Sequence, residues 1–185
     1  MASNPLHLSL FELYTAFRSE RLSAGDLTEQ AIEQHRTTLG AYKYWQPQDA
    51  RNAAARADTS FSAGEDHGPL QGIPVSVKDL YNVDGLQTFA GSPVSIPDSM
   101  MKQGPVITDL NRQQAVFIGK THTVEFAYGG LGVNSHWGRH ETRGIQQNTA
   151  CQEVQAAVRV SAYRKALPCL RWDQTLRGRF GYQPA

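Results

Sequence analysis

One lysine, Lys78, stands where a strand can deliver it for acid–base chemistry. Apolar residues occupy every second position from Ile73 to Val77, which is the pattern of a strand with one buried face. Lys78 ends this strand, and a tight turn is expected a few residues later at Asp84-Gly85. Burial disfavours the charged form of an amine, and a neutral amine is a base. The alternative is a lysine at a solvated strand end, which the strand pattern by itself favours.

The residues around Lys78 also form a longer motif. Residues 68–92 read GPLQGIPVSVKDLYNVDGLQTFAGS, and residues 119–138 read GKTHTVEFAYGGLGVNSHWG. Together they resemble the amidase signature family, serine hydrolases that cleave carboxamides with a Ser–Ser–Lys triad. The family has Asn at the position of His122, which we interpret as a hydrogen-bonding replacement in a loop. The resemblance implies that Lys78 is the base of the triad and that no metal or organic cofactor takes part.

The resemblance covers residues 6–138 and then stops. The family continues with a P-G-G-S-S-S-G loop that supplies the middle serine and a G-S-D-T-x-G-S segment that supplies the nucleophile. Neither occurs in residues 139–185.

The genetic code connects this tail to the missing motifs. Codons permitted for residues 151–159, regrouped into triplets from the last base of the Cys151 codon, encode P-G-G-S-S-S-G-A. Those for residues 171–184 encode L-G-S-D-T-A-G-S-V-R-V-P-A in the same frame. We therefore hypothesise a one-base frame change near the Gly138 codon.

The two parts of the chain also differ in charge. Residues 1–138 hold ten Lys/Arg against fourteen Asp/Glu, whereas residues 139–185 hold eight against three. The whole chain of 185 residues has a net charge of +1, which gives no case for binding nucleic acid or a membrane surface. Two cysteines make neither a disulfide framework nor a metal site. Since no signal peptide or transmembrane segment is evident, a cytoplasmic enzyme is the expectation.

Helical and strand patterns place the motif in an α/β fold. Four helices are expected, near residues 10–17, 23–39, 48–57 and 105–114. Ser9 and Glu12 fit a capping box before the first helix, Gly40 fits the end of the second, and Asp49 fits the start of the third. A strand at 115–119 then predicts a β-α-β crossover. The resemblance implies an incomplete amidase-signature α/β/α fold, with N-terminal helices packed on a mixed, mostly parallel sheet.

Three functional interpretations follow from these patterns. The first is an amidase acting on linear carboxamides of small molecules; since Lys78 alone of the triad is present, we predict that the chain as written is inactive. A local nucleophile at Ser76, on the same strand face, is a weaker alternative because no oxyanion donors are evident. The second interpretation is the glutaminase-like component of a tRNA-dependent amidotransferase, its A subunit. The third is a non-enzymatic fragment with a basic tail.

The predicted organisation has two parts. Residues 1–138 form the N-terminal part of an amidase domain, and residues 139–185 form an aberrant, out-of-frame tail that is disordered or poorly packed. The partial sheet is expected to leave strand edges unpaired. An amide substrate is the expected partner, without nucleic acid or membrane, and assembly into a homo-oligomer is left open.

Overall fold

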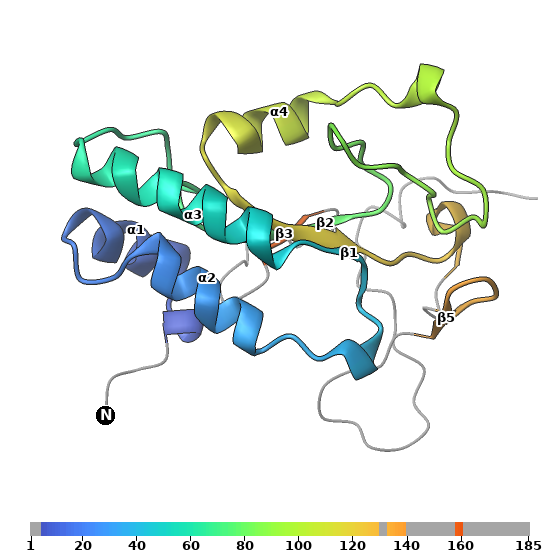
Figure 1. Ribbon diagram of the computed structural model, residues 1–185, viewed down its shortest axis with the longest axis horizontal. Coiled ribbons are helices and arrows are strands. Elements are labelled where there is room, and N and C mark those ends of the chain that lie inside the picture. Colours follow the sequence, from blue (N-terminus) through green and yellow to red (C-terminus); the bar gives the residue numbers. More distant parts are fainter. Residues whose placement is uncertain (1–4, 130–132, 140–157, 161–185) are drawn as a thin grey trace, which may run out of the picture.

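A mixed β-sheet flanked by helices forms the centre of the molecule (Figure 1). The computed structural model describes residues 5–129, 133–139 and 158–160. The helices are α1 (Leu10–Arg18), α2 (Ala24–Glu33), α3 (Pro47–Ser62) and α4 (Pro105–Arg112), with 3₁₀ turns at Pro5–His7, Thr37–Leu39, Asp98–Met100 and Glu125–Ala127. The strands are β1 (Tyr42–Trp45), β2 (Pro74–Lys78), β3 (Val116–Thr121), β4 (Val133–Asn134), β5 (Gly138–Arg139) and β6 (Val158–Val160). None of the described helices is long and apolar enough to span a membrane.

The larger sheet has the strand order β1-β3-β2-β6. β2 and β3 are parallel, with Lys78 opposite Thr121, and α4 lies in the connection between them. This confirms the predicted β-α-β crossover. β1 joins β3 and β6 joins β2, both in antiparallel orientation. The α/β class and the mixed sheet are therefore confirmed, although the described sheet has one parallel pair and two antiparallel pairs.

The strand β6 comes from the predicted out-of-frame tail. Its residues pair with the segment 75–77 of β2, so β2 has a neighbour on each side. The edges of the described sheet are therefore β1 and β6, and the expectation that strand edges stay unpaired remains a prediction. Apart from Arg139 and β6, the tail predicted for residues 139–185 lies outside the described residues.

Local signals explain the start of α1. The Ser9 hydroxyl accepts a hydrogen bond from the Glu12 amide at 3.2 Å, and the Glu12 carboxylate accepts one from the Ser9 amide at 2.6 Å. This is the predicted capping box, in which each side chain satisfies a free amide of the other residue. The bond from the Ser9 amide, and after it the interaction with the Ser9 side chain, lower the pKa of the Glu12 carboxyl.

The second helix is shorter than predicted. α2 ends at Glu33 rather than at residue 39, and the ring of His35 then stacks on that of Trp45 with centroids 4.0 Å apart. This contact with β1 is a tertiary one, so the helical pattern of the sequence does not contain it. Gly40 has a left-handed conformation with φ 56° and ends the 3₁₀ turn at residues 37–39 instead.

The third helix is longer than predicted. α3 begins at Pro47, because the fixed φ of proline suits the first helical turn and its missing N–H has no partner to lose there. Asp49 is not the cap; its carboxylate accepts a hydrogen bond from the Gln46 side chain at 3.1 Å. The alanines of α3 that face the core are fully buried: Ala50, Ala54 and Ala57.

The strand β2 is buried on both faces. Val75 and Val77 belong to the hydrophobic core with Ile73, as the alternation predicts. The opposite face is covered too, since Ser76 is 2% exposed and Lys78 is 8% exposed. Polar residues in the alternating positions therefore do not mark a solvated face here, and the prediction of one buried face was incomplete.

Candidate active site

The side chain of Lys78 is buried at the C-terminal end of β2. This burial agrees with delivery by an apolar strand and rules out a solvated strand end. The chain turns at once: the amides of Leu80 and Tyr81 donate to the Lys78 carbonyl at 2.7 and 3.1 Å, and the Asp79 amide donates to the Thr121 carbonyl at 2.9 Å. Lys78 is thus fixed where β2 and β3 both end, the edge at which open α/β sheets commonly bind ligands.

A second lysine, Lys120 on β3, lies beside the same turn and was missed by the sequence analysis. Its Nζ is 2.7 Å from Oδ1 of Asp79, and the two side chains are 1% and 2% exposed. Nζ also donates to Thr88 Oγ1 at 2.8 Å and to the Gln87 carbonyl at 3.1 Å. Burial lowers the pKa of Lys120, and the Asp79 carboxylate opposes that shift. The sequence did contain a signal for this ion pair: the acidic Asp79 follows the apolar strand β2, and the basic Lys120 lies near the end of the apolar strand β3.

The loop after β2 and the β4–β5 hairpin are tied together by Asn134. Its side-chain amide donates to the carbonyls of Gly91 and Thr123 at 2.7 and 2.9 Å, and its Oδ1 accepts from the amides of His136 and Trp137 at 2.8 and 3.1 Å. Asn134 is 3% exposed, so these bonds replace water for every polar atom of the side chain. The hairpin therefore has a fixed place against the loop that follows Lys78.

An aromatic cluster lies on this assembly. The Trp137 indole donates to the Ser92 carbonyl at 3.0 Å, and its ring centroid is 5.9 Å from that of Phe89 and 6.2 Å from that of His122. His122, which departs from the family pattern, also donates its backbone N–H to the Ala41 carbonyl at 3.0 Å. It thus joins the end of β3 to the start of β1, and the interpretation as a hydrogen-bonding replacement stays a prediction.

Ser76 lies on the same strand face as Lys78. Its hydroxyl is 2.8 Å from the hydroxyl of Tyr42 on β1. A serine needs a neighbouring base to become a nucleophile, and the described contact provides a phenol instead. The structure therefore gives Ser76 a packing and hydrogen-bonding role within the sheet.

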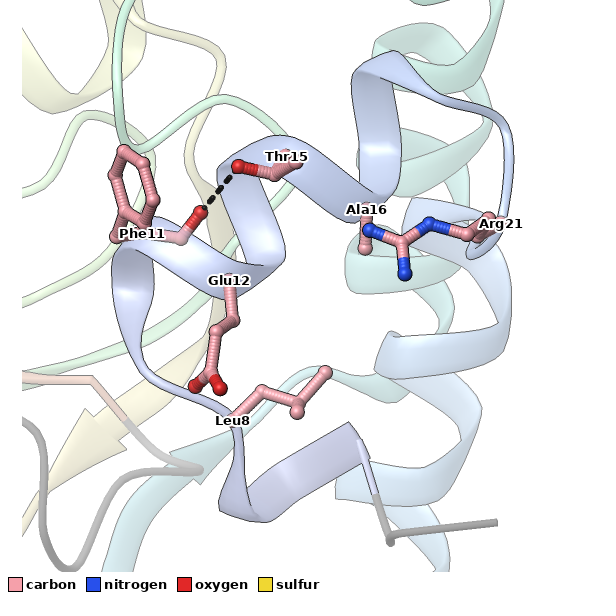
Figure 2. Close-up of a pocket in the computed structure, with 6 residues that line it drawn as sticks. All are labelled: Leu8, Phe11, Glu12, Thr15, Ala16 and Arg21. Atoms are coloured by element: carbon pink, nitrogen blue, oxygen red, sulfur yellow. Dashed lines mark hydrogen bonds between the residues drawn. The ribbon is translucent and has the colours of Figure 1, made fainter.

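A hollow of about 230 Å³ lies beside α1, away from the strand ends, and is lined by Leu8, Phe11, Glu12, Thr15, Ala16 and Arg21 (Figure 2). The Glu12 carboxylate is held by the capping box, and the Thr15 hydroxyl donates to the Phe11 carbonyl at 2.9 Å. These polar groups serve the helix itself, so the hollow is not part of the candidate site. Within the described ranges, no cluster of three or more His, Cys, Asp or Glu could hold a metal ion.

Comparison with known proteins bears on this arrangement directly. Residues 27–142 match the family described as Amidase, and this span includes Lys78, Asp79 and Lys120. The chain belongs to the amidase family. The family membership expected from the two sequence motifs is therefore confirmed.

The relatives of this amidase-family chain are much longer than the chain itself. A 2-amino-5-chloromuconic acid deaminase from Comamonas testosteroni is 49% identical over 138 residues, which make up 73% of this chain and 30% of that protein. An amidase from Pseudomonas putida is 37% identical over 131 residues, with 69% and 28% covered. The A subunit of the glutamyl-tRNA(Gln) amidotransferase from Granulibacter bethesdensis is 36% identical over 134 residues, with 71% and 27% covered.

Solved structures agree with the sequence relatives. A crystal structure of an amidase superimposes with a TM-score of 0.64 at 28% identity, covering 71% of this chain and 30% of that one. The described fold is therefore part of the amidase fold. This chain spans less than a third of the length of each of these proteins.

Proposed function

We propose that this chain is the N-terminal part of a carboxamide hydrolase in which Lys78 is the general base. The observation that carries the proposal is the burial of Lys78 at the end of β2, inside the segment that matches the family. A general base must be held within reach of the hydroxyl that it deprotonates, and burial at the strand end fixes the place of the amine. The ends of β2 and β3 supply a fixed backbone around it.

The proposed reaction is acyl transfer. Neutral Lys78 accepts the proton of the nucleophilic serine through a middle serine while the serine oxygen bonds to the amide carbon. The C–N bond then breaks, and the same proton passes to the nitrogen that leaves as ammonia or an amine. Water next attacks the acyl-enzyme ester, which releases the carboxylic acid and restores the serine hydroxyl. Every step uses protein side chains and water.

We further propose that the chain as written does not hydrolyse amides, because residues 139–185 hold neither serine loop of the family pattern. The permitted codons support a one-base frame change near the Gly138 codon. Sequencing of the DNA across that codon tests this point. Codons that cannot be regrouped into P-G-G-S-S-S-G would refute the frame change.

A hydrolysis assay tests the chemistry. Ammonia release from simple linear amides is measured for the chain as written and for a frame-restored chain, and activity is expected only in the second. In the restored chain, Lys78→Met is expected to lower the rate by about 10²–10⁴-fold, the usual contribution of a general base. The same substitution at the exposed Lys102 is the matched control. Activity of the unrestored chain would refute its inactivity, and an unchanged rate for Lys78→Met would refute the base.

A second candidate function is removal of an amino group from an unsaturated dicarboxylic acid. It is favoured by the 49% identity with the 2-amino-5-chloromuconic acid deaminase, against 37% for the amidase from Pseudomonas putida. Ammonia release by the frame-restored chain from 2-aminomuconic acid, compared with release from simple amides, separates the two. The A subunit of a glutamyl-tRNA(Gln) amidotransferase is the alternative if activity appears only when the other components of such an assembly are added.

A further inference from the structure

Lys43 on β1 carries an ammonium group held by aromatic rings. Its Nζ lies 2.8 Å from the ring centroid of Trp137 and 4.3 Å from that of Phe89. A cation is attracted to the face of an aromatic ring, but the ring carries no net charge and does not neutralise it. No carboxylate among the described residues forms an ion pair with Lys43. Within the described part of the chain, its positive charge is therefore held in place without a counter-ion.

The position of Lys43 relates it to Lys78. Tyr42, the preceding residue, is opposite Thr121 on one side of β3, and Lys78 is opposite Thr121 on the other side. Both lysines therefore lie at the same end of the sheet. Partial burial lowers the pKa of Lys43, and the negative charge of Asp79, in the turn after Lys78, acts in the other direction.

The rings around Lys43 have fixed positions. Trp137 is held by its indole bond to the Ser92 carbonyl and by the Asn134 side chain, and Phe89 is held by the bond from its amide to Asp79 at 3.1 Å. The two rings meet at an interplanar angle of 75°, and Lys43 places a cation at this apolar corner. A ring face beside a cation suits a planar conjugated molecule with a carboxylate. The ammonium would form a charge-assisted hydrogen bond with the carboxylate, and the rings would contact the conjugated carbons.

We propose that Lys43, with Trp137 and Phe89, forms a binding subsite for the carboxylate of a planar unsaturated acid at the same end of the sheet as Lys78. This inference rests on the proposed function, because it names the acidic substrate class for the same site. It also gives a physical basis for the second candidate function, whose substrate carries two carboxylates on a conjugated chain. A purely structural role of the lysine–aromatic contact is the competing explanation.

The test is binding to the full chain as it exists. Isothermal titration calorimetry with cis,cis-muconate and with its uncharged diamide compares two ligands of the same shape. We expect the dianion to bind at least tenfold more tightly than the diamide, and the preference to shrink as salt is added. Equal affinity for the two ligands, or no binding of muconate, would overturn the proposal.

Variants separate binding from packing. Lys43→Met keeps the length of the side chain and its contact with the rings but removes the charge, so muconate binding is expected to weaken about tenfold or more. Lys43→Arg should keep binding, and Lys102→Met is the matched control at an exposed site. If Lys43→Met fails to fold, the comparison of muconate with diamide on the unmodified chain still decides the question. Unchanged binding by folded Lys43→Met would overturn the proposal.

The two proposals fail in different ways. Binding of muconate needs neither serine and no proton transfer by Lys78, so it can be present in a chain that hydrolyses nothing. Loss of hydrolysis in the frame-restored chain would refute the proposed function and leave the binding result intact. Normal hydrolysis combined with equal affinity for muconate and its diamide would refute the carboxylate subsite alone.

Discussion

The ammonium of Lys120 lies 2.7 Å from the carboxylate of Asp79, and both side chains are at most 2% exposed. Asp79 is the residue after Lys78, so this pair joins the end of β3 to the backbone that carries the proposed base. Thr88 and Gln87 accept further hydrogen bonds from Lys120, and Asp79 accepts the amide of Phe89. The Lys120–Asp79 ion pair therefore connects the end of β2, the end of β3 and the loop that follows β2.

Lys120→Met should destabilise the chain by about 3–5 kcal/mol, because it leaves the Asp79 carboxylate buried without its cation. The double variant Asp79→Asn/Lys120→Met should recover part of this loss, since the remaining amide carries no charge. Urea unfolding followed by circular dichroism measures both. Lys102→Met, on the surface, is expected to stay within about 0.5 kcal/mol of the unmodified chain. A Lys120→Met chain as stable as the original would contradict the role of the pair.

Gly72→Ala should be more destabilising than Gly85→Ala. Both glycines have positive φ, 72° and 82°, so alanine costs about 1–2 kcal/mol of backbone strain at either site. At Gly72 a Cβ would also lie 2.8 Å from the Cβ of Ala24 and 3.1 Å from Cε2 of Phe61, whereas at Gly85 nothing lies within 4 Å. Overpacking adds about 1–3 kcal/mol at Gly72 alone. Equal unfolding free energies for the two variants would show that α2 and α3 shift to make room for the added methyl group at residue 72.

The features predicted correctly from sequence are those with nearby causes. The Ser9–Glu12 capping box involves residues three positions apart, and the crossover from β2 to β3 follows from two apolar strands with a helix between them. The features that were missed depend on residues far apart. β1 has no clear period-2 pattern and exists because it pairs with β3, and Lys120 binds Thr88 across 32 positions.

The candidate site shows the same division. Lys78 could be named from its motif and its strand, and its burial agrees with that prediction. The partners that shape its surroundings, Lys120, Asn134 and the Lys43–Trp137 contact, come from three other segments. Single-residue patterns contain no information on which of these segments meet. The order of the strands in the sheet decides it, and that order is set by packing.

The stability of the chain should fall in acid through Asp66. Hydrogen bonds, first from Arg18, then from the Gly68 amide and the Tyr14 hydroxyl, hold the pKa of this carboxyl below its usual range. A depressed folded-state pKa stabilises the fold fully above the unfolded value of about 3.9, and this contribution disappears as the pH falls through the folded value.

Asp66→Asn should therefore be less stable than the original chain at pH 6 and approach it in stability toward pH 2. Urea midpoints measured across this range give the difference. Asp98→Asn, at an exposed site without an ion pair among the described residues, is the control and should run parallel to the original chain. If the difference in stability between the Asp66→Asn chain and the original chain stays constant with pH, the effect comes from lost packing and not from the charge of the carboxylate.

Asn134→Ala should release the β4–β5 hairpin from the loop after β2. The substitution removes two donors from the carbonyls of Gly91 and Thr123, and one acceptor from the amides of His136 and Trp137. Leaving buried polar groups without partners costs about 1–3 kcal/mol for each group, so the hairpin should detach before the core unfolds.

Trp137 would then lose its contacts with Lys43 and Phe89, which should shift tryptophan emission to longer wavelength and raise its quenching by iodide. Asn52→Ala, on the exposed face of α3, should leave the emission unchanged. An Asn134→Ala chain with unchanged emission and quenching would show that the aromatic cluster holds the hairpin without Asn134.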